Sequence, residues 1–110
     1  MNSENLDHIF SALSDPTRRA LLEQLCEGEA SVGVLAASYE MSQPAISKHI
    51  KVLERAGLVR KDRRGREHFV SANLTPAKEA AGWIEKYAQY WTAQFDAVEA
   101  YLQSKKETKQ

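Results

Sequence analysis

The residues best suited to chemistry lie between Ser42 and Arg66, in the segment "SQPAISKHIKVLERAGLVRKDRRGR". This segment holds eight lysines and arginines against two acidic residues, although the whole chain of 110 residues has a formal net charge of zero. Residues 1–40, in contrast, hold two basic residues against seven acidic ones. Phosphate binding depends on where cations are concentrated rather than on total charge. The segment therefore predicts contact with a nucleic acid.

A helix over residues 43–56 would place the side chains of this segment on two faces, one apolar and one polar and cationic. A helix that reads the major groove needs short side chains for close approach, a Gln or Ser for base edges and lysines for phosphates. A solvated surface is the plain alternative, but a second basic cluster at a hairpin tip favours DNA. The predicted DNA-binding residues are Ser42, Gln43, Pro44, Ser47, Lys48 and Lys51 on the helix, and Arg63, Arg64 and Arg66 on the hairpin.

The elements that position these residues follow from local signals. Apolar residues at helical spacing over 6–13 predict a first helix, and Asp15 caps a second that ends at Gly28. Ser31 and Ser42 cap two further helices, which together predict a helix-turn-helix over about 31–56. A hairpin over about 58–72 follows, with the positive φ of a bulge at Gly65. A last helix is expected over about 75–104.

The fold class expected is mainly α with a small β-hairpin, a winged helix-turn-helix with flanking N- and C-terminal dimerisation helices. It forms one domain over residues 1–104, and residues 105–110 form a flexible tail. The last helix carries an apolar seam longer than one small domain needs, so we expect a homodimer. The predicted dimer interface comprises Leu6, Ile9, Phe10, Ile84, Tyr87, Trp91, Phe95, Val98 and Leu102.

Composition limits the other classes of function. One cysteine, no apolar run that could cross a bilayer and no signal-peptide pattern predict a cytoplasmic protein without membrane contact. No spacing of nucleophile and base predicts catalytic residues, and three scattered histidines make no metal site. Cys26 is expected to be buried beside the leucines of the second helix. His49 is expected at the rim of the apolar face or against DNA.

Three segments resemble the ArsR family of bacterial winged-helix transcriptional repressors: "SDPTRRALLEQL", "MSQPAISKHIKVLERAGLV" and "RRGREHFVSANL". The resemblance spans about residues 10–74 and implies a symmetric dimer on a palindromic operator in double-stranded DNA, often at its own promoter. It also implies the helix and wing contacts given above. Ser31 and Gly33 stand where arsenic-sensing members carry a Cys-x-Cys pair, and the last helix lacks the histidines of zinc-binding members. We therefore expect no metal and no cofactor, and the small-molecule effector is unknown.

Two other functions fit the same pattern. A winged helix can bind protein without specific DNA binding, although such a module should expose apolar anchors where this helix exposes lysine, serine and glutamine. Trp83, Tyr90 and Trp91 of the last helix could instead line a ligand pocket. The charge pattern favours DNA over both.

Overall fold

The computed structural model describes residues 3–107 as five helices and three strands. The elements are α1 (Ser3–Leu13), α2 (Pro16–Glu27), β1 (Ala30–Ser31), α3 (Val32–Ser38), α4 (Gln43–Arg55), β2 (Val59–Arg64), β3 (Glu67–Ala72) and α5 (Thr75–Glu107). The chain forms two compact units that meet within α5, between Ala80 and Ala81. We call the described residues up to Ala80 the N-terminal unit and residues 81–107 the C-terminal unit.

Side-chain caps begin three helices of the N-terminal unit, as the sequence predicts. Asp15 accepts a hydrogen bond from the Arg18 N–H at 3.0 Å and begins α2. Ser31 and Ser42 accept from N–H groups three residues further on, each at 3.2 Å, and begin α3 and α4. Because these hydroxyl and carboxylate oxygens satisfy otherwise unpaired N–H groups, the helix starts are fixed by local sequence.

Two left-handed residues end the helices of the helix-turn-helix. Gly57 has φ 75°, and the N–H groups of residues 57 and 58 return to the carbonyls of Glu54 and Leu53 at 2.9 and 3.0 Å. Glu40 has φ 52° and closes α3 in the same way. Its own N–H donates to the Ala37 carbonyl, and the Met41 N–H donates to the carbonyl of residue 36. Glycine is the usual residue at such a position, so Glu40 holds its conformation at a cost in backbone energy.

The sheet has the order β1-β3-β2 and is antiparallel throughout. The pairing of β2 with β3 is unbroken from Val59↔Ala72 to Arg64↔Glu67, so a two-residue turn joins the strands. Gly65 has the positive φ that the sequence predicts, 64°, but the predicted bulge is wrong because no residue is left unpaired in the register. The sequence also missed β1, since two residues carry no alternating pattern.

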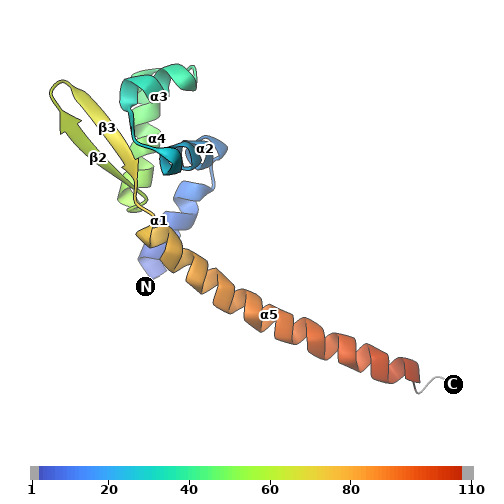
Figure 1. The fold of residues 1–110 in the computed structure, drawn as a ribbon. Coiled ribbons are helices and arrows are strands. Elements are labelled where there is room, and N and C mark those ends of the chain that lie inside the picture. The colour runs from blue at the N-terminus through green and yellow to red at the C-terminus, as the bar shows by residue number, and fades with distance from the viewer. Residues whose placement is uncertain (1–2, 108–110) are drawn as a thin grey trace. The chain divides into compact units, whose positions relative to one another are not determined.

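One hydrophobic core joins the elements of the N-terminal unit. Buried leucines, isoleucines and valines from α1, α2, α3, α4 and the sheet form a single cluster, which Ala80 at the end of this unit also enters. In Figure 1 the hairpin of β2 and β3 stands beside α4, and α3 packs against α4. The helix-turn-helix and the wing are therefore held by the same core, with the outer face of α4 left to solvent.

The C-terminal unit is a single helix whose side chains are exposed throughout residues 81–106. The helix runs to Glu107, three residues beyond the predicted end at Ser104, and residues 108–110 of the predicted tail lie outside the described residues. Within residues 3–107, none of the helices has both the length and the apolar character that crossing a membrane would require.

Candidate nucleic-acid interface

The polar face of α4 and the wing meet at two adjoining hollows on the N-terminal unit. One hollow is lined by Pro44, Ser47, Lys48, Lys51, Glu54 and Lys61. The other is lined by Ser31, Val32, Gly33, Gln43, Ser47, Lys61, Arg66, Glu67 and His68. Because Ser47 and Lys61 line both hollows, the start of α4 and the wing form one continuous surface. We call this surface the α4–wing face.

The core sets the rotation of α4 that presents this face. Ile46, Ile50 and Leu53 are buried, so the opposite side of α4, which carries Lys48 and Lys51, points to solvent. Lys48 and Lys51 are exposed, and Ser47, which lines both hollows, is partly buried. A short side chain flanked by lysines is the arrangement that lets a helix approach base edges while cations meet phosphates.

Strand alternation divides the wing into two faces. Lys61 pairs with Val70 and Arg63 pairs with His68, so these side chains share one face of the hairpin. Arg64 lies on the opposite face with Asp62 and Phe69. The hairpin therefore does not bring the three predicted arginines together.

Two of the predicted wing arginines lie near the turn. Arg66 lines the hollow beside Gln43. Arg63 is exposed, and its Nε donates to the Gly65 carbonyl at 3.1 Å, which holds the side chain against the turn. Both positions suit contact with a DNA backbone that passes the tip of the wing.

The third predicted wing arginine, Arg64, is bound within the chain. Its Nη1 and Nη2 donate to the two carboxylate oxygens of Glu29 at 2.6 and 3.0 Å, and its Nε donates to Asp62 at 3.3 Å. These hydrogen bonds hold the pKa of the Glu29 carboxyl below its usual value and raise the pKa of the guanidinium. Arg64 thus differs from Arg63 and Arg66 in having its charge already balanced.

His49 lies behind the α4–wing face rather than on it. Its Nδ1 is 3.3 Å from Arg18 Nη1 and 3.8 Å from Asp15 Oδ2, both at the start of α2. Arg18 also donates to the carbonyls of Ala12 and Ser11 at the end of α1, at 2.8 and 3.1 Å. Of the two roles left open by the sequence, the structure gives His49 the packed position at the rim of the core.

Lys61 and His68 are two residues of this face that the sequence did not single out as DNA contacts. Lys61 counted toward the basic segment, but its place opposite Ser47 depends on the packing of β2 against α4. The signal available was alternation along the strand, since Val59 is buried and residues 61 and 63 share its face.

The predicted dimer-interface residues fall into two groups. On α1, Ile9 is 1% exposed and belongs to the core of its own chain, so it offers no surface to a partner. Leu6 is partly buried against the same core, and Phe10 is 40% exposed. On α5 every predicted residue is exposed: Ile84, Tyr87, Trp91, Phe95, Val98 and Leu102.

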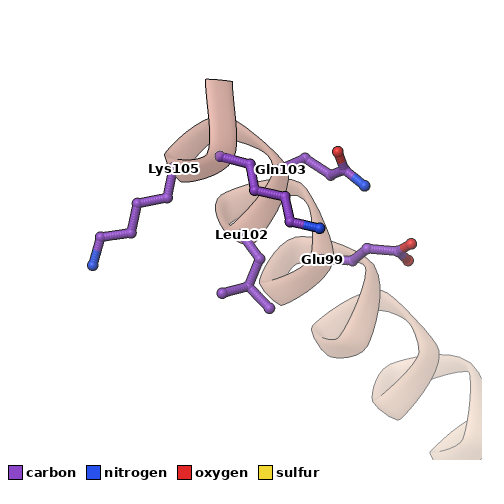
Figure 2. A pocket seen from close by; sticks show the side chains of 5 residues that line it. Glu99, Leu102, Gln103 and Lys105 are labelled. Atoms are coloured by element: carbon purple, nitrogen blue, oxygen red, sulfur yellow. The ribbon is translucent and has the colours of Figure 1, made fainter. Parts of the chain in front are cut away.

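Aromatic side chains gather on α5 without an enclosing wall. Trp83 stacks on Tyr87 with ring centroids 4.8 Å apart, beside a hollow that Lys86 and Tyr90 also line. A second hollow is lined by Glu99, Leu102, Gln103, Lys105 and Lys106 (Figure 2). Because one helix supplies all the lining residues in each case, these are surface grooves rather than the ligand pocket considered above.

Cys26 is exposed, so the prediction of a buried cysteine is wrong. It follows Leu25, which is buried, and one residue of helical rotation carries its side chain to the solvent side of α2. Within residues 3–107, no group of three or more His, Cys, Asp or Glu side chains is placed to hold a metal ion.

Comparison with known proteins gives consistent matches. Residues 15–61 match the model of the family described as bacterial regulatory protein, arsR family. The chain is 33% identical over 79 residues to the transcriptional repressor SdpR of Bacillus subtilis, which covers 72% of this chain and 88% of SdpR. It is 40% identical over 90 residues to the HTH-type transcriptional regulator YuzN of the same organism, over 74% of this chain and 97% of YuzN.

Solved structures show the same likeness. A crystal structure of an ArsR family transcriptional regulator has 36% identity and a TM-score of 0.78, and the match covers 84% of this chain and 95% of that one. The homodimeric winged helix-turn-helix DNA-binding domain Mb0332 of Mycobacterium bovis has 23% identity and a TM-score of 0.64, over 78% of this chain and 80% of that one. At that identity the second likeness concerns the fold alone.

Proposed function

Because this chain belongs to the ArsR family of bacterial regulatory proteins, we propose that it is a homodimeric transcriptional repressor that binds a palindromic operator in double-stranded DNA. The observation that carries this proposal is the α4–wing face, where Ser47 and Lys61 join the hollows of helix and hairpin. A cationic surface that combines a helix start with a hairpin fits one major groove and the backbone beside it.

Each side chain of the face has a role in this proposal. Gln43 and Ser47 meet base edges, because they are the short or amide-bearing groups at the start of α4. Lys48, Lys51 and Lys61 pair with phosphates, and Arg63 and Arg66 extend these contacts along the wing. Ser42 and Pro44 shape the start of the helix, where N–H groups face the DNA.

The homodimer is proposed from the apolar side chains that each unit leaves exposed. On the C-terminal unit, Trp91 and Phe95 are 53% and 67% exposed, a large apolar area for a helix in water. A second copy of the chain would cover this area through a two-fold axis and space two α4 helices about 34 Å apart, one turn of DNA. The homodimeric domain that shares this fold is consistent with that assembly.

Other functions have less support. We propose a regulator in the cytoplasm rather than an enzyme, since its relatives are regulatory DNA-binding proteins. The protein-binding module is not favoured, because the hollows of the α4–wing face are lined mainly by lysine, arginine, serine and glutamine rather than by apolar anchors. The effector stays unassigned.

Fluorescence anisotropy tests the proposal directly. The DNA upstream of the chain's own gene and a scrambled duplex of the same composition are titrated over a series of salt concentrations. We expect tighter binding to the native duplex and affinity that falls steeply with salt, because phosphate contacts release counterions. Equal, weak binding to both duplexes would contradict an operator in that DNA. Failure to bind either duplex at low salt would overturn DNA binding itself.

Ser47→Glu tests the α4–wing face. A carboxylate at this position adds a negative charge to the surface that meets the groove, so we expect affinity for the operator to fall at least about tenfold with no change in thermal stability. Gln89→Glu is the matched control, because it adds the same charge to an exposed position of α5. Equal affinities of the two variants would show that α4 does not read the DNA.

A further inference from the structure

We propose that Glu29 withholds Arg64 from DNA and uses it to position the wing, so that Arg63 and Arg66 carry the phosphate contacts of the hairpin. This inference rests on the proposed DNA binding. It assigns opposite roles to arginines that are neighbours in sequence. The inference is based on the geometry of the Arg64 guanidinium. Its consequence is that the wing binds DNA less tightly than its number of arginines would allow.

The Arg64 guanidinium is engaged on its edges and on one face. Its two terminal nitrogens donate hydrogen bonds to the Glu29 carboxylate at 2.6 and 3.0 Å, which is the bidentate geometry that suits arginine best. Nε donates a hydrogen bond to the Asp62 carboxylate at 3.3 Å, and the guanidinium carbon lies 4.8 Å from the ring centre of Phe69. A phosphate would have to displace Glu29 to gain the same two nitrogens.

The pair bridges the sheet rather than one strand. Glu29 directly precedes β1, Arg64 ends β2, and β3 lies between these strands. Phe69 of β3, which pairs with Ser31, lies under the guanidinium. Because Ser31 is also the cap of α3, the ion pair ties the outer end of β2 to the segment that begins the helix-turn-helix. It therefore sets the direction of the wing relative to the helices that meet DNA.

Charge on the two faces of the hairpin agrees with this division. On the Arg64 face, one guanidinium meets two carboxylates, from Glu29 and Asp62, and their formal sum is negative. The face that carries Arg63 also carries Lys61. A DNA backbone is attracted to the second face and repelled by the first. The side chains of the Arg64–Glu29 pair are 50% and 43% exposed, so the pair contributes little to stability. Its main effects are to neutralise the Arg64 charge and to fix the direction of the wing.

The salt dependence of binding measures which arginines meet phosphates. Each phosphate contact contributes about 0.9 to the slope of log affinity against log salt, and a homodimer makes every contact twice. A non-specific duplex is the probe, because it reports phosphate contacts without requiring the operator. The variants are Arg63→Ala, Arg64→Ala, Arg66→Ala, Glu29→Gln and the double variant Glu29→Gln/Arg64→Ala, each shown by thermal unfolding to be folded.

We expect Arg63→Ala and Arg66→Ala to lower the slope by about 1.8 per dimer and Arg64→Ala to leave it unchanged. Glu29→Gln should free Arg64, raise the slope and raise affinity at low salt by about tenfold. The double variant should lose that gain. Glu27→Gln is the matched control, because it also removes a negative charge from an exposed position just before β1 but contributes no bond to Arg64. The control substitution should raise the affinity for DNA less than Glu29→Gln does, and this smaller increase should persist when it is combined with Arg64→Ala.

Three outcomes would overturn the inference. The first is a slope for Arg64→Ala as low as that for Arg63→Ala, which would make Arg64 a phosphate contact. The second is a gain from Glu29→Gln that survives in the double variant, which would make the effect one of net charge alone. The third is the absence of binding to any duplex by wild type and variants, which would overturn the proposed function as well. The first two leave the proposed function intact.

Discussion

The two units of the chain treat the same kinds of side chain in opposite ways. In the N-terminal unit, Leu21, Leu35 and Leu53 are 0% exposed within one cluster. In the C-terminal unit, Trp91 and Phe95 are more than half exposed on a helix with no core beneath them. Apolar burial drives folding, so the first unit carries its own stabilisation, while the proposed homodimer would supply the second with the surface that covers its apolar side chains. The comparison separates what folds the chain from what assembles it.

Truncating one residue in each unit should give the largest contrast. Leu53→Ala removes a fully buried side chain and should lower the free energy of unfolding by about 2–5 kcal/mol. Val98→Ala truncates a side chain that is 56% exposed. In the monomer at low protein concentration it should change the free energy of unfolding by less than about 0.5 kcal/mol, and it should weaken self-association. Urea unfolding at several protein concentrations distinguishes the two, because only association depends on concentration. Equal losses at every concentration would mean that Val98 is a core residue of its own chain.

Charging the exposed face of α5 should separate assembly from folding. Trp91→Glu should give a folded monomer, because the carboxylate cannot be buried without a partner. Affinity for a palindromic operator should fall by about 100-fold or more, since one half-site is then bound without its tethered neighbour. Sedimentation measures the assembly and anisotropy measures the affinity. An intact dimer would remove this face of α5 from the interface, and Gln89→Glu, on the opposite side of the helix, should remain dimeric.

The features predicted correctly from the sequence are those that depend on residues close together in the chain. The caps Asp15, Ser31 and Ser42 were predicted correctly, because a cap acts within three residues of its own position. The apolar face of α4 and the hairpin were predicted for the same reason, since helical and strand periods are local. Cys26 was placed on the wrong side of α2 because one step of rotation at the edge of a face decides burial.

The parts of the site that escaped prediction depend on contacts between distant segments. The place of Lys61 beside Ser47 needs the packing of β2 on α4, and the pairing of Arg64 with Glu29 joins residues 35 apart. Sequence counts cations correctly but does not say which carboxylate each one meets. That is why three arginines at the wing were predicted as one cluster, whereas the register of the strands puts Arg63 and Arg64 on opposite faces and Arg66 lies in the turn between the strands.

The smallest predicted effects come from three substitutions, two at left-handed positions and one inside α5, and they test whether the units unfold independently. Glu40→Gly removes the strain of a left-handed non-glycine residue and should stabilise the N-terminal unit by about 0.5–1 kcal/mol. Gly57→Ala, at φ 75° and with its new Cβ 3.3 Å from Pro76 Cγ, should destabilise the same unit.

Gly82→Ala adds a Cβ that meets nothing within 4 Å and should stabilise α5 by a similar amount, about 0.5–1 kcal/mol. Hydrogen exchange locates each effect. If the units unfold independently, Gly82→Ala slows exchange in α5 alone. Slower exchange in β3 as well would show that the helix and the core open together, and the contrast between a unit that folds itself and one that awaits a partner would then fail.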